Sequence, residues 1–132
     1  MKLEKMQSDL RMCSFYFEKC SIERGEQIEK GEFDADLKRE FTCKPDNEYD
    51  VTLTLKIKGN NLSAEIVAKA SFAFHSNGED LDEEKKNNII KNNTVAIMFP
   101  FIRSQVSLLT TQPGMAPIVL PPINTANFTD DM

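Results

Sequence analysis

The stretch YDVTLTLKIKGNNLSAEIVAKASFAF, residues 49–74, decides the fold, because apolar and polar residues alternate along it on both sides of a turn signal. Such alternation is typical of strands with one face in the core and one in solvent. The turn signal is Gly59-Asn60-Asn61, whose residue types tolerate the positive backbone torsions of a tight turn. We therefore expect residues 49–57 and 62–74 to pair as an antiparallel hairpin.

Two further strands are expected upstream of this hairpin. In residues 31–43, GEFDADLKREFTC, alternate positions form an apolar side (Phe33, Ala35, Leu37, Phe41 and Cys43). Residues 10–22, LRMCSFYFEKCSI, have Phe15 and Phe17 on one side and three other apolar residues on the opposite side (Leu10, Met12 and Tyr16). We interpret this segment as a strand that is covered on both faces along part of its length.

Helical features replace the alternation after Phe74. Asp80 and Glu83 have the spacing of a capping box, which marks the beginning of a helix. The helix that follows is polar. We expect it to end near the two asparagines at 92–93.

A second helix is expected over residues 94–111, where apolar side chains recur at helical spacing. Pro100 should kink or break it near Ala96, because proline removes one backbone hydrogen bond. The Pro-Gly pair at 113–114 should end it. Residues 115–128 contain three more prolines, so we expect this tail to lie extended along the body of the protein.

The second helix carries more apolar side chains than one face needs, because Ile97, Phe101 and Leu108 lie partly outside its main stripe. Self-association would bury this surplus. We expect an interface of two aromatic residues from the first strand and four apolar residues from the helix (Phe15, Phe17, Phe99, Ile102, Val106 and Leu109). The elements together predict one α+β domain over residues 1–132, a four-stranded antiparallel sheet followed by helices packed on one of its faces.

The charge and the cysteine content limit the range of functions that the sequence allows. The 132 residues include 21 acidic and 16 basic side chains, a net charge of −5, which disfavours nucleic acid and anionic lipid as partners. No window approaches the roughly 18 apolar residues of a membrane span, and the N-terminus has no signal-peptide core, so we expect a cytoplasmic protein. The three cysteines lack CxxC spacing, which favours reduced thiols over disulfides or a zinc site.

Signals of catalysis are weak. The single histidine, His75, stands beside Ser76, but no nucleophile-elbow motif surrounds this serine. The acidic run after residue 79 lacks the ligand spacing of an EF-hand, and the sequence has no Gly-rich phosphate loop. We therefore expect neither an enzyme nor a cofactor.

The segment NNTVAIMFPFIRSQVSLLTTQPGMAPIVLPPINTANF, residues 92–128, resembles the SecB family of bacterial protein-export chaperones. It has a Phe-Pro-aromatic-x-Arg core in the main helix, a glycine-containing turn, a run with prolines, leucine and asparagine, and a terminal phenylalanine. The matching positions are Phe99, Pro100, Phe101, Arg103, Gly114, Pro117, Leu120, Pro122, Asn124 and Phe128. The upstream strands agree with the family in number, order and approximate spacing.

This resemblance implies subunits with a four-stranded antiparallel sheet, paired into dimers and usually into a dimer of dimers. It implies that unfolded polypeptide clients are held in apolar grooves and passed to the SecA export motor, with no cofactor and no bond broken. The expected client-binding residues are Phe33, Leu37, Phe41, Met115, Ile118, Leu120, Ile123 and Phe128. Acidic residues on the exposed sheet face, Glu23 and Glu65, are expected to contact the motor, and Lys19 stands where a third acid is expected.

Typical members of the family continue beyond the Pro-Asn-Phe segment into a second long helix and a short polar tail, whereas this sequence ends at NFTDDM. A shallower groove and a weaker tail-dependent contact with the motor are therefore expected. Two alternatives stay open. One is a dedicated chaperone for a single client, such as the antitoxin of a toxin–antitoxin system, and the other is an oligomeric adaptor without a client groove.

Overall fold

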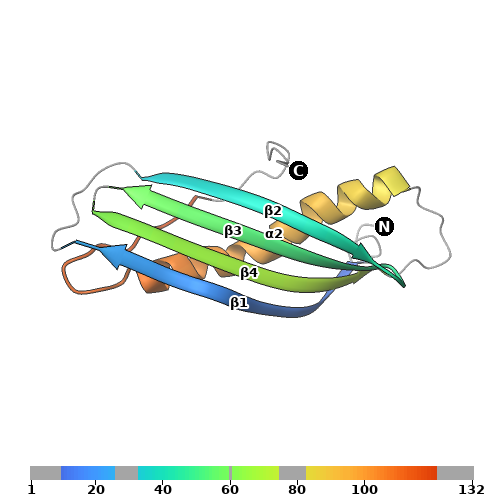
Figure 1. The fold of residues 1–132 in the computed structure, drawn as a ribbon, viewed down its shortest axis with the longest axis horizontal. Helices are drawn as coiled ribbons and strands as arrows, with labels where there is room; N and C mark the ends of the chain where they lie inside the picture. Colours follow the sequence, from blue (N-terminus) through green and yellow to red (C-terminus); the bar gives the residue numbers. More distant parts are fainter. Residues whose placement is uncertain (1–9, 26–32, 60, 75–82, 122–132) are drawn as a thin grey trace, which may run out of the picture.

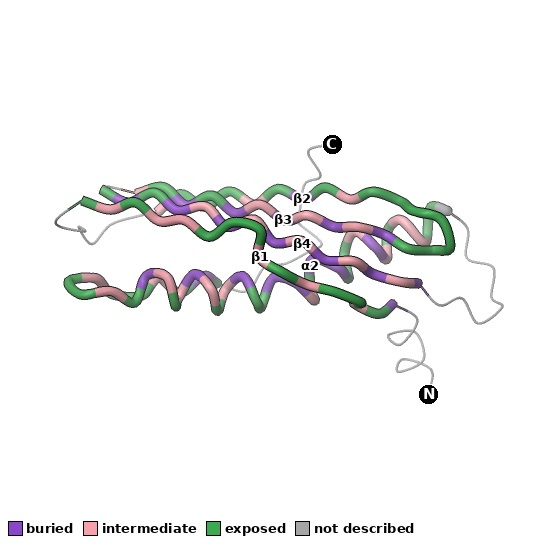
Figure 2. The backbone as a smooth tube through the Cα atoms, turned by 60° about the horizontal axis from the view of Figure 1, so that its bottom comes forward, coloured by how far each residue is buried: buried purple, intermediate pink, exposed green. Residues whose placement is uncertain are grey.

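The computed structural model describes residues 10–25, 33–59, 61–74 and 83–121, which form a sheet layer and a helix layer. The sheet consists of β1 (Leu10–Arg24), β2 (Asp34–Lys44), β3 (Glu48–Gly59) and β4 (Leu62–Phe74). The helix α2 (Glu83–Leu109) crosses one of its faces (Figure 1 and Figure 2). The strand order is β1-β4-β3-β2, and every pairing is antiparallel. The predicted α+β class and the four-stranded antiparallel sheet are thus confirmed.

The predicted hairpin of β3 and β4 forms the centre of the sheet. Its pairing extends to Gly59↔Leu62, and Asn61 in the turn has a φ of 60°. The turn between β2 and β3 uses two more residues with positive φ, Asp46 at 66° and Asn47 at 58°. Asparagine and aspartate adopt the left-handed region more readily than other residues with a side chain. Both turns are therefore favoured by their local sequence.

The core lies between α2 and the face of the sheet turned toward it, here named the inner face. The positions predicted to form the apolar sides of β3 and β4 are all buried there (Tyr49, Val51, Leu53, Leu55, Ile57, Leu62, Ala64, Ile66, Ala68, Ala70, Phe72 and Phe74). Of the four strands, β4 is the one that α2 approaches most closely. Three alanines on the inner face of β4 (Ala64, Ala68 and Ala70) allow this approach because they have short side chains.

Two β-bulges interrupt the alternation of β1. Its pairing with β4 skips one residue at Cys13 and one at Glu18. A bulge inserts one extra residue, so the side chains that follow it move to the other face. The apolar side chains of β1 therefore share the inner face (Leu10, Met12, Phe15, Phe17 and Ile22). The interpretation of this strand as covered on both faces is wrong, and Tyr16 on the opposite, outer face is 54% exposed.

α2 is one helix where two were predicted. It continues through the asparagines at 92–93 and through Pro100, without a break near Ala96. Asparagine in a helix costs below about 1 kcal/mol relative to alanine, and an internal proline costs about 3 kcal/mol. Burial offsets these costs, because the neighbouring side chains lie in the core (Ile90, Val95, Met98, Phe99 and Ile102). Asp80 of the predicted capping box, His75 and Ser76 lie outside the described residues.

The buried stripe along α2 and just past its end follows every fourth residue (Ile90, Thr94, Met98, Ile102, Val106 and Thr110). A row of this spacing is inclined by about 26° to the helix axis. Its two threonines are satisfied within the helix, because their hydroxyls donate to the carbonyl oxygens of Ile90 and Val106. Different faces of α2 therefore meet the solvent at its two ends.

Candidate functional site

The chain turns back after α2, and residues 113–121, here named the strap, run beside the second half of the helix (Figure 1). Gly114 in the turn has a φ of 76°, which favours glycine. The Met115 amide donates to the Gln112 carbonyl oxygen at 3.1 Å. Arg24 at the end of β1 donates through Nη1 to the Pro113 carbonyl oxygen at 2.9 Å. The turn is therefore held both by its own backbone and by the sheet.

A polar row, formed by Arg103, Ser107 and Thr110, binds the main chain of the strap. Arg103 Nε donates to the Leu120 carbonyl oxygen at 3.0 Å. Ser107 Oγ donates to the Ile118 carbonyl oxygen at 3.1 Å, and the Ile118 amide donates to Thr110 Oγ1 at 2.7 Å. The strap is thus extended along α2, as predicted for the tail, of which residues 122–128 lie outside the described part.

Alternate side chains of the strap point to the core and to solvent. Leu120 is 8% exposed and belongs to the core, Ile118 packs against the core margin, and Val119 between them is 74% exposed. A hollow of about 490 Å³ opens between strap and helix (Pro100, Arg103, Ser104, Ser107, Val119 and Leu120). The strap therefore covers the core margin with Ile118 and Leu120 and leaves an open hollow between itself and the polar residues Arg103, Ser104 and Ser107.

The predicted groove residues at β2 are half-buried on the inner face. The ring of Phe33 lies on Gly59, where an added Cβ would be 2.4 Å from Phe33 Cδ1. Leu37 is paired with Leu55 of β3. Lys91 Nζ of α2 lies 5.7 Å from the ring centre of Phe41, within cation–π range. Gly59 is therefore required for the position of Phe33.

The structure brings most of the predicted groove residues to the margin of one core. Phe33, Leu37 and Phe41 contact this core from the sheet, and Ile118 and Leu120 contact it from the strap. Met115 is half-buried. Two further predicted residues, at 123 and 128, lie outside the described residues.

A second half-exposed apolar surface, here named the β1-edge patch, lies where α2 passes β1 (Phe15, Phe17, Ile97, Phe101 and Leu108). The ring centres of Phe15 and Phe101 are 5.0 Å apart, and those of Phe15 and Phe17 are 5.2 Å apart. Phe101 is 47% exposed and Leu108 is 68% exposed. β1 is an edge strand, so the patch adjoins an open edge of the sheet.

Half of the residues predicted for self-association lie in the core of the single chain. These are three apolar residues of α2, none more than 6% exposed (Phe99, Ile102 and Val106). Packing against the sheet already buries their side chains, so they have little surface left for a second copy. The other three residues keep part of their surface accessible (Phe15, Phe17 and Leu109).

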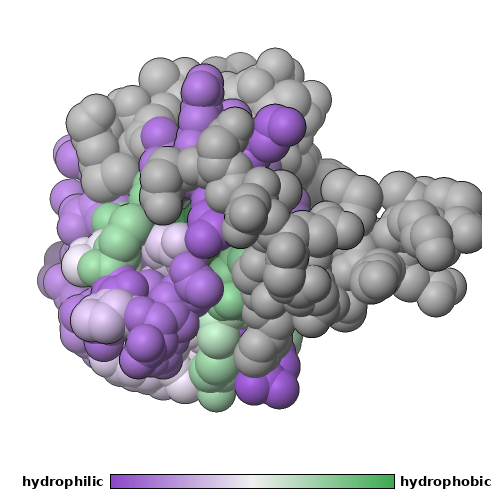
Figure 3. Space-filling model, turned by 90° about the vertical axis from the view of Figure 1, so that its right-hand side faces the viewer, coloured by the Kyte–Doolittle hydropathy of each residue, from purple (hydrophilic) through white to green (hydrophobic). Residues whose placement is uncertain are grey.

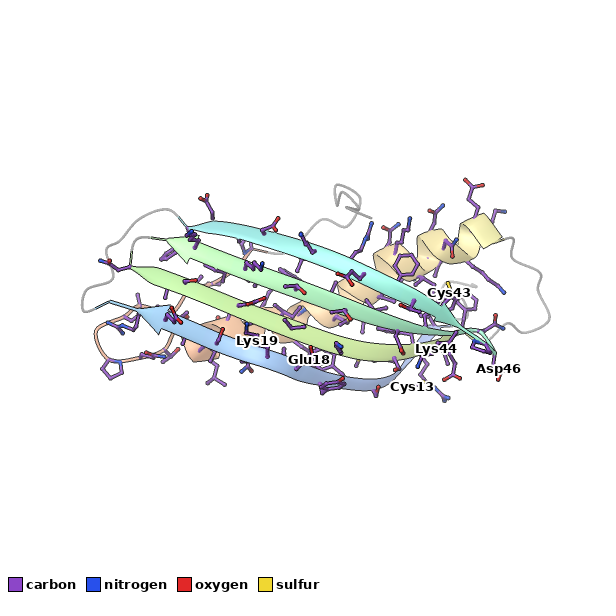
Figure 4. All side chains as sticks on the ribbon, viewed as in Figure 1. Cys13, Glu18, Lys19, Cys43, Lys44 and Asp46 are labelled. Carbon is purple, nitrogen blue, oxygen red and sulfur yellow. The ribbon has the colours of Figure 1, made fainter. Side chains whose placement is uncertain are left out.

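The outer face of the sheet is polar and is crossed by ion pairs between strands. Nζ of Lys19 lies 2.7 Å from Glu65 Oε1, and Nζ of Lys69 lies 2.9 Å from Glu18 Oε2. A third pair joins Lys44 and Asp50 at 2.7 Å. Figure 4 shows Glu18 and Lys19 along β1 and Lys44 near the turn between β2 and β3. Opposite charges on neighbouring strands contribute to strand pairing.

The two acids predicted to contact the export motor differ in their surroundings. The Lys19 ammonium group donates a hydrogen bond to Glu65 and lowers the pKa of this carboxyl. Glu23 is exposed near the end of β1. The lysine in place of an expected acid therefore reduces the negative charge around Glu65.

Sequence patterns mark Arg103 within a motif but give no role to Ser107 or Thr110. The three positions have i, i+4, i+7 spacing, so they lie on one face of the helical turn. A polar row of this kind, directly before a proline-rich segment, is the signal that could have identified them.

The described residues offer neither a metal site nor a membrane-spanning helix. In the described parts of the chain, His, Cys, Asp and Glu side chains form no group of three or more that could hold a metal ion. Over the same residues, no helix combines the length and the apolar character needed to span a membrane. The three cysteines are free and exposed (Cys13, Cys20 and Cys43).

Sequence comparisons agree with the fold. The family model for SecB, the preprotein translocase subunit, matches residues 4–130. The protein-export protein SecB of Magnetococcus marinus is 29% identical over 99 residues, which cover 74% of this chain and 62% of that protein. An uncharacterized protein of Methanocaldococcus jannaschii is 40% identical over 45 residues, which cover 34% of this chain and 29% of that protein. The chain thus spans less than two thirds of the length of either relative.

A solved structure has the same fold. The SecB-like chaperone Rv1957 of Mycobacterium tuberculosis, in complex with a ChAD peptide from the HigA1 antitoxin, superimposes with a TM-score of 0.73. The match covers 91% of this chain and 95% of that chain at 15% identity, a level that shows the fold alone. Because the family model spans nearly the whole chain and the sheet and helix agree with it, the protein belongs to the SecB family.

Proposed function

We propose that this protein is a chaperone that holds non-native polypeptides on apolar surface and uses no energy source to do so. The observation that carries the proposal is the half-exposed apolar surface on both sides of α2. Seen from the end of the sheet beside the β2–β3 turn, hydrophobic side chains gather between hydrophilic ones (Figure 3). Exposed apolar patches rimmed by polar residues mark interaction sites. Membership in the SecB family supports the same function.

Client contacts are assigned to the margin formed by β2 and the strap (Phe33, Leu37, Phe41, Met115, Ile118 and Leu120) and, on the sequence pattern alone, to Ile123 and Phe128. Aromatic and aliphatic side chains supply contact area without requiring a particular client sequence. Burial of about 500 Å² of client surface at ~25 cal/mol per Å² contributes on the order of 12 kcal/mol before ordering costs. The net charge of −5 favours clients with basic stretches.

Self-association is assigned to the β1-edge patch, as a dimer or a dimer of dimers. Several client sites on one oligomer would raise the affinity for a long client through multivalency.

Delivery to the SecA motor is assigned to the outer face, through Glu23 and Glu65. Since Lys19 is paired with Glu65, Lys19→Ala should strengthen that contact.

Two other candidates share parts of this architecture. The first is a dedicated chaperone for one client, such as an antitoxin. It is favoured by the fold neighbour, whose structure contains an antitoxin peptide. The second is an oligomeric adaptor without a client groove, which the half-buried residues at the groove margin disfavour.

The test is suppression of aggregation of two unrelated heat-denatured enzymes by the purified protein. Leu37→Ser and Phe41→Ser should each weaken client binding about tenfold, since burial of one large apolar side chain contributes roughly 1.5–3 kcal/mol. Val67→Ser is the matched control, because Val67 is half-buried on the outer face and should leave binding unchanged.

Three outcomes separate the candidates. Suppression with both enzymes supports a general chaperone. Binding of one partner only, isolated from the source cell, supports the dedicated form. If the protein holds no unfolded chain at all, the chaperone function is rejected and the adaptor remains.

A further inference from the structure

The polar row binds the strap through the main-chain atoms of the strap. The three hydrogen bonds from Arg103, Ser107 and Thr110 reach two carbonyl oxygens and one amide of the strap, and none of them reaches a strap side chain. Ile118 is bound at both its amide and its carbonyl oxygen, as a residue in a sheet is bound by a neighbouring strand. Main-chain groups are common to all polypeptides, so the row can bind any extended segment in this position.

The spacing of the row matches an extended chain. Arg103 and Ser107 are four residues apart, a rise of about 6 Å along a helix. Their acceptors, the carbonyl oxygens of Ile118 and Leu120, are two residues apart, about 6.6 Å along an extended chain. The next positions toward the start of the helix, Phe99 and Pro100, offer no side-chain donor. The match therefore covers a segment of about three residues.

The side chains of the strap define what such a segment must contain. Leu120 and Ile118 enter the core and its margin, whereas Val119 between them points to solvent. The site thus takes apolar residues at positions i and i+2 and tolerates any residue at i+1. Stretches of this kind are common in unfolded chains, because half-buried strands alternate in the same way.

We infer that the strap is the resident occupant of a peptide-binding site. Its displacing ligand is an extended segment of an unfolded polypeptide with apolar residues at i and i+2. The polar row binds the main chain of whichever segment is present. This inference rests on the proposed chaperone function and refines it: Ile118 and Leu120 here occupy the site until a client displaces them, so at this one site they compete with the client and do not bind it. It adds the position of the site and the pattern that the site accepts.

Competition with the strap makes the site selective. Pro117 and Pro121 restrict Ala116 and Leu120 to extended conformations, so the strap loses little conformational entropy when it binds. Its attachment to the same chain also gives it a high effective concentration. However, it buries only Leu120 fully and leaves a hollow of about 490 Å³ beside it. A client that buries both of its apolar side chains fully, or that offers several suitable segments, can therefore replace it.

The first test is hydrogen exchange of the Ile118 amide in the unmodified protein. This amide donates to Thr110 Oγ1. Saturation with a permanently unfolded chain, reduced and carboxymethylated α-lactalbumin, should increase its exchange rate at least about tenfold, as expected when a protecting hydrogen bond opens. Photoreactive benzoylphenylalanine at position 104, in the wall of the hollow, should crosslink to the client in the same complex.

The second test uses variants of the strap. Ile118→Ala and Leu120→Ala weaken the occupant and leave the polar row intact, so each should lower the Kd for the unfolded chain about three- to thirty-fold. Val119→Ala, in the same segment but exposed, is the control and should change nothing. Arg103→Ala removes a hydrogen bond from strap and client alike, so the Kd should not fall.

The outcomes distinguish this inference from the function on which it rests. If no unfolded chain binds the unmodified protein, the chaperone proposal itself is rejected. If the chain binds while the Ile118 amide stays protected and position 104 does not crosslink, the function stands and the displaced strap is rejected. Weaker binding by Ile118→Ala and Leu120→Ala, with correct folding shown by unchanged exchange in β3 and β4, would mean that the strap lines the groove instead of occupying it.

Discussion

Arg39 is a charged side chain on the inner face of the edge strand β2. It is 5% exposed, and its Nη1 donates to the Lys91 carbonyl oxygen of α2 at 2.8 Å. This contact joins the edge of the sheet to the helix. An inward-pointing charge also disfavours pairing of β2 with a foreign strand, because edge strands that carry such charges are poor templates for aggregation.

Replacement of Arg39 by methionine keeps an unbranched apolar stem and should destabilise the protein by about 2 kcal/mol, through loss of a hydrogen bond from a charged donor. Urea denaturation would measure the change. Lys38→Met, at the exposed neighbouring position, is the control and should stay within about 0.5 kcal/mol of the original protein. Equal stability of Arg39→Met would show that desolvation of the charge cancels the benefit of its hydrogen bond.

Asp50 makes stability depend on pH in the acidic range. Hydrogen bonds from Lys44 and Ser71 lower the pKa of its carboxyl in the folded protein. As the pH falls below about 5, the unfolded chain takes up the proton first, near its ordinary pKa of about 3.9, so the folded state loses stability until the pH passes below its own lower pKa. Because the carboxyl is partly exposed, the contribution should be below about 1 kcal/mol.

Urea denaturation at pH 7 and pH 3 would test this dependence with Asp50→Asn. The variant should lose less stability between the two pH values than the original protein. An identical loss in both would show that other carboxyls carry the acid sensitivity.

Among the elements, β1 shows how a single residue can change the face of a strand. Glu18 is the extra residue of the bulge, because the strand register passes directly from Phe17↔Ala68 to Lys19↔Val67. Deletion of Glu18 would make these two pairs consecutive and would leave Phe17 on the inner face. Deletion of Tyr16 shortens the strand equally, but it would turn Phe17 outward and place Glu18 opposite buried Ala68.

We therefore expect deletion of Glu18 to be tolerated and deletion of Tyr16 to cost at least about 2 kcal/mol more, since it buries a carboxylate and exposes a phenylalanine. Chemical denaturation of the two variants gives the comparison. Equal destabilisation would contradict the assigned bulge.

The strand faces were predictable wherever pairing is regular. Alternation identified the inner face of β3 and β4 because each residue in these strands has one partner on either side. It failed for β1, because a bulge adds a residue of ordinary type and leaves no mark in composition. The helix prediction failed at the asparagines of 92–93 for a different reason. Local propensity is weak, and burial of Ile90 and Val95 against the sheet outweighs it.

At the scale of the whole molecule, the proposed assembly depends on the β1-edge patch. Phe101→Ser and Leu108→Lys should lower the mass of the proposed oligomer in sedimentation velocity, because they place polar groups in an apolar contact. Their effect on thermal stability should be small, since both side chains are about half-exposed or more in the single chain. Val119→Ser, exposed on the strap, should leave the mass unchanged. An unchanged mass in the patch variants would exclude this surface as the interface.

Sequence patterns suggest the apolar part of the candidate site but give no sign of its polar row. Apolar residues at β2 and in the tail stand out in an acidic sequence, which is why Leu37 and Leu120 could be named in advance. The roles of Ser107 and Thr110 depend on where the chain returns after Gly114. The path of the chain after Gly114 is set by packing of the whole molecule. The residue types at positions 107 and 110 do not indicate this path.

The strand order has a consequence for the order in which the sheet folds. β1 pairs with β4 alone, although β2 and β3 separate the two in the chain. We therefore expect β1 to join the sheet last although it is synthesised before the other three strands, because contacts between neighbouring hairpin strands form before contacts that close a long loop. Until then its phenylalanines are accessible on a nascent chain. Pulse-labelling during refolding should show protection of the β3 and β4 amides before those of β1. By this order, the folding protein would itself expose the kind of apolar, extended segment that it is proposed to hold for other chains.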